Sequence, residues 1–374
     1  MKIGILTYHR AENYGALLQS YALLSFLRSL GHDVSFVDYW PEYHKDYFRI
    51  LPHRRFRQVG VKHKALILYQ AIVWGLPRLK RKRVLKHFMY THLGVAHSAE
   101  YSSENEICSE FDVVVYGSDQ IWRQQKLPGH SGVDYWYYGS ENVRARKIAY
   151  AASMGASELA EEEKQKVRQL LNGFEALSVR ESSLHDFLDL MGYSSSIVVD
   201  PVFLLTAEQW RKLYRSELLS NTRKQKYILF YNLLNSPVSS SFAEKLSKLH
   251  NLPIVEITKK YGIKQLGGRY VQSASVPEFL SLVDNAEYVV SNSFHGVAMS
   301  IIFEKQFFAV GMGNKADRVQ SLLQAFHIEE RFINEIATVS EDMIDYTVLQ
   351  NKREKYIQES KIFLKNHVGS KSFF

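Results

Sequence analysis

The chain has 374 residues, of which 46% are hydrophobic and 23% are charged, a globular composition that excludes disordered and fibrous classes. A single hydrophobic core stops growing near about 250–300 residues, so the length favours two domains. The one cysteine, Cys108, excludes a disulfide framework and a cysteine-based zinc site. Since no basic residue or histidine neighbours Cys108, we do not expect it to be a nucleophile.

The formal net charge of +8 comes from one segment, 50–99, which contains no Asp or Glu and is interleaved with apolar residues and Trp74. Its eleven cations are Arg54, Arg55, Arg57, Lys62, Lys64, Arg78, Lys80, Arg81, Lys82, Arg83 and Lys86. Three interpretations are open: an interfacial helix that binds an anionic membrane surface or a lipid diphosphate, a solvated basic insertion, or a nucleic-acid contact. No zinc knuckle, RNP motif or helix-turn-helix spacing is present, so we expect no nucleic-acid partner.

The N-terminus lacks the apolar run and the cleavage site of a signal peptide. The longest apolar stretch, 65–76, is too short to span a bilayer. We therefore expect a cytoplasmic protein, neither exported nor integral to the membrane, which the basic segment would bring to the inner face of the membrane.

Strand and helix patterns alternate along most of the chain, which predicts βαβ units and parallel sheets. The predicted strands are 2–7, 34–38, 111–116, 147–152, 176–179, 197–199, 227–231, 253–258, 288–291 and 307–311. The predicted helices are 16–30, 161–174, 183–191, one that starts at 203, 238–250, 277–285 and 295–303.

The expected fold is α/β, with two Rossmann-like domains facing a cleft. The N-terminal domain is predicted at 1–205 with the basic insertion at about 50–99, and the C-terminal domain at 206–374, ending in helices. The polar stretch 221–226 lies near this boundary. There is no internal repeat and no glycine-rich phosphate loop. Ligands of such sheets bind beyond the carboxyl ends of the strands, so residues there are the candidates for function.

Two clusters follow strands of the predicted N-terminal domain. Asn13 and Gly15 precede the first helix, where they can bind an anion or sugar hydroxyls, or only cap that helix. Residues 117–122 place a hydroxyl, a carboxylate, an amide and an indole after one strand, and they could recognise a sugar or, for the first two, only cap a helix. The proposed acceptor contacts in it are Ser118, Asp119, Gln120 and Trp122, with Asp119 as the general base.

Arg180 follows a predicted strand, where its guanidinium can bind a carboxylate or phosphate, or pair with Glu181 or Glu175. Asp200 precedes a proline and is explained well by a turn.

The segment 291–296, Ser-Asn-Ser-Phe-His-Gly, lies between a strand and an apolar helix. Small hydroxyls and backbone N–H groups at a helix N-terminus favour an anion, and the imidazole of His295 can supply a proton. We take this segment as the strongest candidate, with Asn292, Ser293 and His295 as its functional residues.

In this order the clusters resemble the polysaccharide pyruvyl transferase family, from residue 3 to about 331. The resemblance rests on Asn13-Tyr-Gly-Ala-Leu-Leu-Gln-Ser-Tyr-Ala-Leu23, Val115-Tyr-Gly-Ser-Asp-Gln-Ile-Trp122, Ala149-Tyr-Ala-Ala-Ser-Met-Gly155, Val179-Arg-Glu181, Asp200-Pro-Val202, Ser293-Phe-His-Gly296 and Asp317-Arg-Val.

The resemblance implies a glycosyltransferase-B-like fold, phosphoenolpyruvate as donor and co-substrate, no other cofactor and no metal. It implies that Arg180 and the loop with Ser293 and His295 hold the donor. Many members have Arg-Leu-His where this chain has Ser-Phe-His at 293–295, so the donor phosphate would be held by Ser293, Asn292, the helix N-terminus or Arg318. The acceptor would be a sugar diol of a cell-surface polysaccharide, either free or linked to undecaprenyl diphosphate.

In the expected chemistry, His295 protonates the enol of the donor and Asp119 takes a proton from a sugar hydroxyl. One alternative is a nucleotide-sugar glycosyltransferase, with Glu278 and the loop 291–296 at the nucleotide. Another is a member of the family that binds glycan without catalysis.

Overall fold

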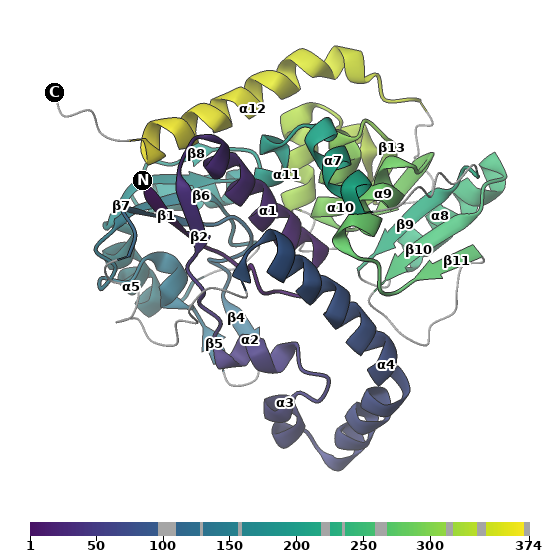
Figure 1. Ribbon diagram of the computed structural model, residues 1–374, viewed down its shortest axis with the longest axis horizontal. Helices are drawn as coiled ribbons and strands as arrows, with labels where there is room; N and C mark the ends of the chain where they lie inside the picture. Colours follow the sequence, from purple (N-terminus) through teal and green to yellow (C-terminus); the bar gives the residue numbers. More distant parts are fainter. Residues whose placement is uncertain are drawn as a thin grey trace. The chain divides into compact units, whose positions relative to one another are not determined.

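The computed structural model describes residues 1–95, 110–127, 130–155, 159–217, 225–233, 236–258, 268–311, 317–334 and 342–369. Cys108 and most of the predicted boundary stretch 221–226 lie outside them. The chain divides into two compact units. Unit 1 comprises Met1–Leu204 and Tyr356–Phe374, and unit 2 is Leu205–Lys355. Each unit contains one parallel six-stranded sheet, and Figure 1 labels the strands and helices of both.

The sheet of unit 1 has the order β2-β1-β3-β6-β7-β8, with every neighbouring pair parallel. Its strands are β1 (Lys2–Leu6), β2 (Asp33–Phe36), β3 (Val113–Tyr116), β6 (Arg146–Ala152), β7 (Phe174–Val179) and β8 (Ser196–Ile197). Its helices are α1 (Tyr14–Ser29), α5 (Glu161–Leu171) and α6 (Ser182–Leu190), with the 3₁₀ helices η3 (Tyr135–Tyr138) and η4 (Pro201–Leu204). The strand order reverses between β1 and β3, which makes this the switch point of the sheet.

The sheet of unit 2 has the order β11-β10-β9-β12-β13-β14, again all parallel. Its strands are β9 (Ile228–Asn232), β10 (Ile254–Thr258), β11 (Gly268–Val271), β12 (Tyr288–Ser291), β13 (Gln306–Val310) and β14 (Phe332–Ile333). Its helices are α7 (Ala207–Glu217), α8 (Pro237–His250), α9 (Val276–Asp284), α10 (Phe294–Ile302) and α11 (Asp317–Phe326), with the 3₁₀ helix η5 (Glu329–Arg331). This is the doubly wound order of a Rossmann fold, with its switch point between β9 and β12.

The central strands of both sheets are mostly apolar because parallel sheets are covered on both faces. Every residue of β3 and of β9 is buried. The prediction of an α/β protein with two Rossmann-like domains is therefore confirmed. The short strands β11 and β14 were not predicted, because four and two residues give too little alternation to recognise.

The basic insertion forms the helices α2 (Glu42–Tyr47), α3 (His53–Gln58) and α4 (Val61–His92), the last with Pro77 inside it. A short antiparallel pair, β4 (Gln125–Leu127) and β5 (His130–Gly132), belongs to unit 1 as well. None of the helices that the structure describes is both long enough and apolar enough to cross a bilayer.

The last helix, α12 (Tyr346–Val368), begins in unit 2 and ends in unit 1. The hydroxyl of Ser360 accepts a hydrogen bond from the backbone N–H of Val199 at 3.0 Å. Arg146 donates to the carbonyl oxygens of His367 at 2.8 Å and of Gly369 at 3.3 Å. The predicted extent of the second domain, 206–374, is corrected by these contacts, because the chain from Tyr356 onward packs with unit 1.

Candidate functional site

The turn after β3 holds Asp119 at the switch point of the unit 1 sheet. Gly117 has a φ of +119°, and a Cβ at this position would lie 2.3 Å from the carbonyl oxygen of Tyr150, so only glycine fits. Asp119 itself has a left-handed φ of +73°. This conformation is uncommon for residues other than glycine and is found often at functional sites. Its carboxylate accepts a hydrogen bond from the N–H of Gln120 at 2.8 Å and is 13% exposed.

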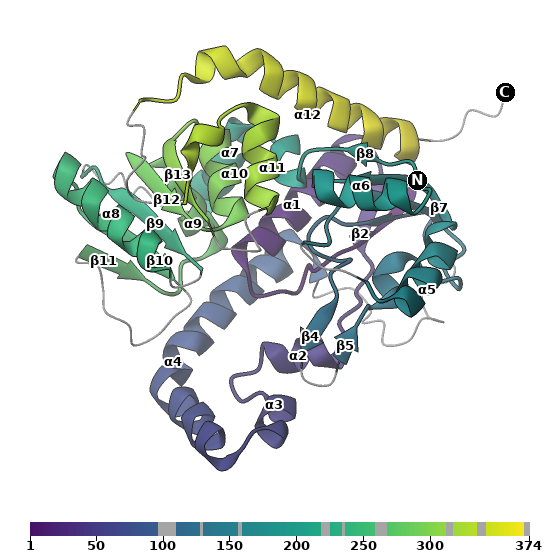
Figure 2. The same ribbon diagram turned by 180° about the vertical axis from the view of Figure 1, so that it is seen from behind.

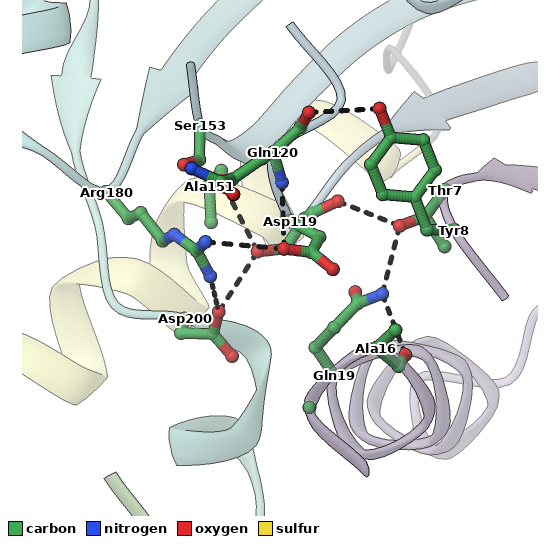
Figure 3. Close-up of polar contacts among 12 residues, drawn as sticks. Thr7, Tyr8, Ala16, Gln19, Asp119, Gln120, Ala151, Ser153, Arg180 and Asp200 are labelled. Carbon is green, nitrogen blue, oxygen red and sulfur yellow. Dashed lines mark hydrogen bonds and ion pairs between the residues drawn. The ribbon is translucent and has the colours of Figure 1, made fainter. Parts of the chain in front are cut away.

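Beneath Asp119 lies a buried ion cluster around Arg180 (Figure 3). The guanidinium pairs with Asp200, lies 3.5 Å from Glu181 and 3.6 Å from Asp119, and its side chain is 1% exposed. Ser118 donates to Asp200 at 3.1 Å. Burial alone would lower the pKa of Arg180, but Asp200, Glu181 and Asp119 raise it, so the guanidinium stays charged. Three carboxylates around one cation leave this cluster with an excess of negative charge.

The donor contact predicted for Arg180 is corrected by this arrangement. A guanidinium that is 1% exposed and surrounded by carboxylates has no open face for an anionic ligand. Ser118 is fully buried, and its one hydroxyl proton is shared between Asp200 and the carbonyl oxygen of Ala151, each at 3.1 Å, so the predicted acceptor contact of its hydroxyl is corrected too. Both residues hold the turn that carries Asp119.

Hydrogen bonds from β1 and α1 fix the same turn (Figure 3). Thr7 donates to the carbonyl oxygen of Ser118 at 2.8 Å, and Gln19 donates to Thr7 at 3.0 Å. Tyr8 donates to the carbonyl oxygen of Gln120 at 3.0 Å, and burial, with the carboxylates Asp134 and Asp119, raises the pKa of Tyr8. The sequence analysis missed Thr7, Tyr8 and Gln19, although the position of Thr7 and Tyr8 at the end of the first strand was a usable signal.

Trp122 is packed in the core of unit 1, and Asn13 caps the first helix. Trp122 is fully buried, donates its indole N–H to the carbonyl oxygen of Tyr137 at 2.7 Å and stacks on Tyr138. A buried indole cannot stack on a sugar, so the predicted acceptor contact of Trp122 is corrected. Asn13 caps α1 by accepting from the N–H of Gly15 at 3.1 Å, and Gly15 is buried, as the alternative reading of this pair expected.

In unit 2, the loop after β12 is tied to the end of β9 at the switch point. The Asn292 side chain accepts from the N–H of Leu233 at 2.7 Å and donates to Asn232 at 2.9 Å. A Cβ at Gly296 would lie 2.3 Å from the hydroxyl oxygen of Ser291, so glycine is needed for close packing here. The side-chain amide of Asn292 thus forms hydrogen bonds within the protein. Its role is to position the loop, and the predicted contact with the donor is corrected.

The N-terminus of α10 carries polar side chains that are largely buried, and Ser293 is 5% exposed. Ser293 occupies the N-cap position, yet its hydroxyl forms no capping bond, and no other hydrogen bond of it is found among the described residues. His295 lies in the first turn and is 6% exposed. The guanidinium of Arg318, from α11, lies 6.0 Å from the centre of the Phe294 ring. The first N–H groups of a helix lack intrahelical partners, so this end of α10 favours an anion.

Each unit therefore brings together part of the predicted site. Unit 1 holds Ser118, Asp119, Gln120 and Arg180, and unit 2 holds Asn292, Ser293 and His295 in one loop, with Arg318 near the Phe294 ring. The amide of Gln120 is half-buried, and no hydrogen bond of it is found within the part of the chain that the structure describes. Among the same residues no group of three or more His, Cys, Asp or Glu side chains is placed to hold a metal ion.

Two Rossmann-like sheets with polar loops at both switch points define a doubly wound α/β protein, a class in which ligands bind at the carboxyl ends of the strands. The sequence matches the profile of the family described as polysaccharide pyruvyl transferase over residues 13–314. This match covers most of the chain, so the protein belongs to the polysaccharide pyruvyl transferase family and is a transferase of polysaccharide biosynthesis. A comparison with curated proteins gave no match.

Solved structures of similar architecture include sugar-nucleotide epimerases and glycosyltransferases. UDP-GlcNAc 2-epimerase from Neisseria meningitidis is 8% identical, with a TM-score of 0.46 over 96% of this chain and 94% of that one. UDP-N-acetylglucosamine 2-epimerase from Rickettsia bellii is 12% identical, with a TM-score of 0.42 over 98% of each chain. The E. coli heptosyltransferase WaaC is 11% identical, with a TM-score of 0.42 over 96% of this chain and 100% of that one. The fold assignment itself rests on the strand orders of the two sheets.

Proposed function

We propose that this protein transfers a pyruvyl group from phosphoenolpyruvate to a sugar diol of a cell-surface polysaccharide or its lipid-linked precursor, forming a cyclic ketal. The observation that supports the proposal is the N-terminus of α10 in a chain of this family, where Ser293 is uncapped, His295 lies in the first turn and Arg318 lies 6.0 Å from the centre of the Phe294 ring. These groups suit the phosphate and carboxylate of phosphoenolpyruvate, and Arg318 supplies the guanidinium that residue 293 lacks.

The acceptor is assigned to the loop of unit 1 on the ground of charge. The excess of carboxylates around Arg180 would repel the anionic donor but not a neutral diol. Asp119 is the partly exposed carboxylate of that cluster, and Gln120 follows it with an amide that can bind hydroxyls. Asp119 is therefore the proposed general base.

The proposed reaction balances without a further reactant. His295 gives a proton to C3 of the enol, and positive charge develops at C2. A sugar hydroxyl adds to C2 and gives its proton to Asp119, and the bond from C2 to the phosphate oxygen then breaks. The second hydroxyl adds to C2 as phosphate leaves, closes the ketal ring and gives its proton to the departing phosphate, while the proton on Asp119 replaces the one that His295 gave to C3. The N-terminus of α10 and Arg318 would stabilise the departing phosphate.

A nucleotide-sugar glycosyltransferase is the weaker candidate. Glu278, which that reading placed at the nucleotide, accepts from the N–H of Ser275 at 2.7 Å in a capping box of α9. Its carboxylate is thus engaged in the helix start.

The test is a thermal-shift titration with phosphoenolpyruvate beside a panel of nucleotide sugars, on the wild type, Arg318→Gln and the control Arg215→Gln. A ligand at about 100 times its Kd adds roughly 2.7 kcal/mol to the free energy of unfolding. We expect stabilisation by phosphoenolpyruvate that is weakened in Arg318→Gln and kept in Arg215→Gln. Stabilisation by a nucleotide sugar alone would overturn the donor.

A further inference from the structure

Helix α4 carries a solvent-exposed apolar stripe along its first half. Val61, Ile72 and Leu76 are 82%, 80% and 79% exposed, and Leu68 and Leu79 are exposed as well. Their spacing of three, four and seven residues places them on one side of the helix. We call these five residues the outer stripe. Leu66, Tyr69 and Val73 beside it are also exposed.

This concentration of apolar side chains has no equal elsewhere in the described residues. Of the seventeen large hydrophobic side chains that are strongly exposed there, nine lie on α4. Single exposed hydrophobic residues are normal on protein surfaces, whereas a contiguous patch marks an interaction surface. The first half of α4 is therefore a surface that lacks its partner.

The inner side of α4 holds cations as well as the buried Ile67. Lys64 lies 5.7 Å from the centre of the Phe56 ring on α3. Arg78 donates to the carbonyl oxygen of Ile50 at 3.3 Å, and Lys82 donates to that of Phe48 at 3.2 Å. Figure 1 and Figure 2 both show α3 beside the first half of α4, which extends away from the unit 1 sheet. Internal contacts thus fix the helix with its apolar side outward.

Exposed cations border the outer stripe at both ends. Lys62 lies at the first turn, and Lys80, Arg83 and Lys86 follow Leu79. No Asp or Glu occurs in the whole segment 50–99, so nothing in this segment neutralises them. An apolar stripe flanked by cations matches the chemistry of an anionic lipid surface, where the stripe enters the acyl boundary and the cations contact head groups.

We infer that the outer stripe of α4 docks this protein onto an anionic lipid bilayer, with the helix lying in the plane of the interface. The helix does not have the apolar length and composition to span the bilayer. This inference stands on the surface of α4 and does not depend on pyruvyl transfer.

Two other occupants fit the surface less well. In a symmetric pair of copies the same patch meets itself, so the cations at the ends of the stripe would face cations with no carboxylate of the segment between them. A nucleic acid would pair with the exposed cations but would leave the apolar side chains of the outer stripe in water.

The experiment is co-sedimentation of the full chain with vesicles of phosphatidylcholine alone and of phosphatidylcholine with phosphatidylglycerol, at low and high salt. We expect binding to the anionic vesicles at low salt, weakened at high salt because exposed charges are screened. A Leu76→Trp variant should show a blue shift of its indole emission on those vesicles. Absence of binding at low salt would overturn the inference.

Two variants with a matched control locate the surface. Ile72→Ser with Leu76→Ser should lower the partition coefficient about tenfold or more, since two apolar groups leave the interface. Leu190→Ser with Leu249→Ser removes two exposed leucines elsewhere, 84% and 53% exposed, and should leave binding unchanged. All four positions are exposed, so the variants should fold, and an unchanged melting temperature checks this.

The same variants test whether the surface binds a second copy of this chain instead of a bilayer. If Ile72→Ser with Leu76→Ser turns a dimer into a monomer in sedimentation equilibrium while vesicle binding is unchanged, the surface binds a second copy and the inference is wrong. Equal loss of binding in the control pair would also overturn it, because the effect would not belong to α4.

Discussion

The loops 117–122 in unit 1 and 291–296 in unit 2 both follow strands at the switch points of their sheets, but they differ in charge. The first rests on an ion cluster with three carboxylates and one guanidinium. The second contains no acidic residue and opens a buried helix. The same position in two similar folds thus differs in charge, and under the proposed function this charge, rather than the fold, selects the ligand of each loop.

The largest effect on stability is expected when the ion cluster of unit 1 loses its cation. Arg180→Met should lower the free energy of unfolding by about 3–5 kcal/mol, because three buried carboxylates lose their common cation. Urea denaturation measures this. The control is Arg215→Met, since Arg215 forms an exposed pair with Glu208 and should change stability by less than about 0.5 kcal/mol. Equal effects of the two substitutions would mean that the ion cluster contributes little to the free energy of unfolding.

Asp119→Asn, in the same loop, should lower turnover without lowering the free energy of unfolding. Turnover should fall about 10²–10⁴-fold if Asp119 is the general base. The free energy of unfolding should not fall, because Arg180 keeps Asp200 and Glu181 as partners. Phosphate release and denaturation on the same preparation measure both. Turnover within about tenfold of the wild type would remove Asp119 from the mechanism.

Acidification should weaken the support of the unit 1 loop. Burial, with His130 nearby, lowers the pKa of His44 from 6.5 to about 4, and His44 contacts the Tyr8 ring edge-on. The folded state thus favours neutral His44, so this stability is present above pH 6.5 and is lost as the pH falls toward about 4. The loss is at most about 3 kcal/mol. Melting temperatures of the wild type should fall more steeply over this range than those of His44→Gln, and parallel curves would contradict the assignment.

The smallest expected effects compare two serines, one in each loop. Ser118→Ala should lower the free energy of unfolding by about 1–3 kcal/mol, because it removes a buried donor that the carbonyl oxygen of Ala151 and the Asp200 carboxylate share. Ser293→Ala should leave stability nearly unchanged, since its hydroxyl is not engaged within the described residues. It should instead weaken phosphoenolpyruvate binding by about 0.5–1.5 kcal/mol, measured by calorimetry. The reverse pattern would exchange the roles of the loops.

Much of the fold could be predicted from the sequence, because continuous β-branched runs such as 113–116 and 288–291 become buried parallel strands. The position of His295 at a helix N-terminus followed from the same pattern. The burial of Arg180 and Trp122 could not be predicted, because their partners come from distant parts of the chain. Arg180 meets Asp200 beyond the next helix, and Trp122 meets Tyr137 from a 3₁₀ helix that has no periodic signal.

The domain prediction failed at α12 for a related reason. Its sequence is helical throughout, and only the contacts of its last turns with Arg146 and Val199 assign them to unit 1. The orientation of α4 was equally hidden, since apolar and basic residues alternate around it and the sequence does not say which side faces inward.

The uncapped start of α10 has a consequence for the motion of this helix. A helix whose N-cap side chain forms no bond frays more readily at its first turn. An anion bound there would accept hydrogen bonds from the backbone N–H groups that the Ser293 side chain does not cap. It would take the place of the N-cap side chain. The rate of hydrogen exchange at the first backbone amides of α10 should therefore fall when the donor binds. This rate would then measure the occupancy of the site.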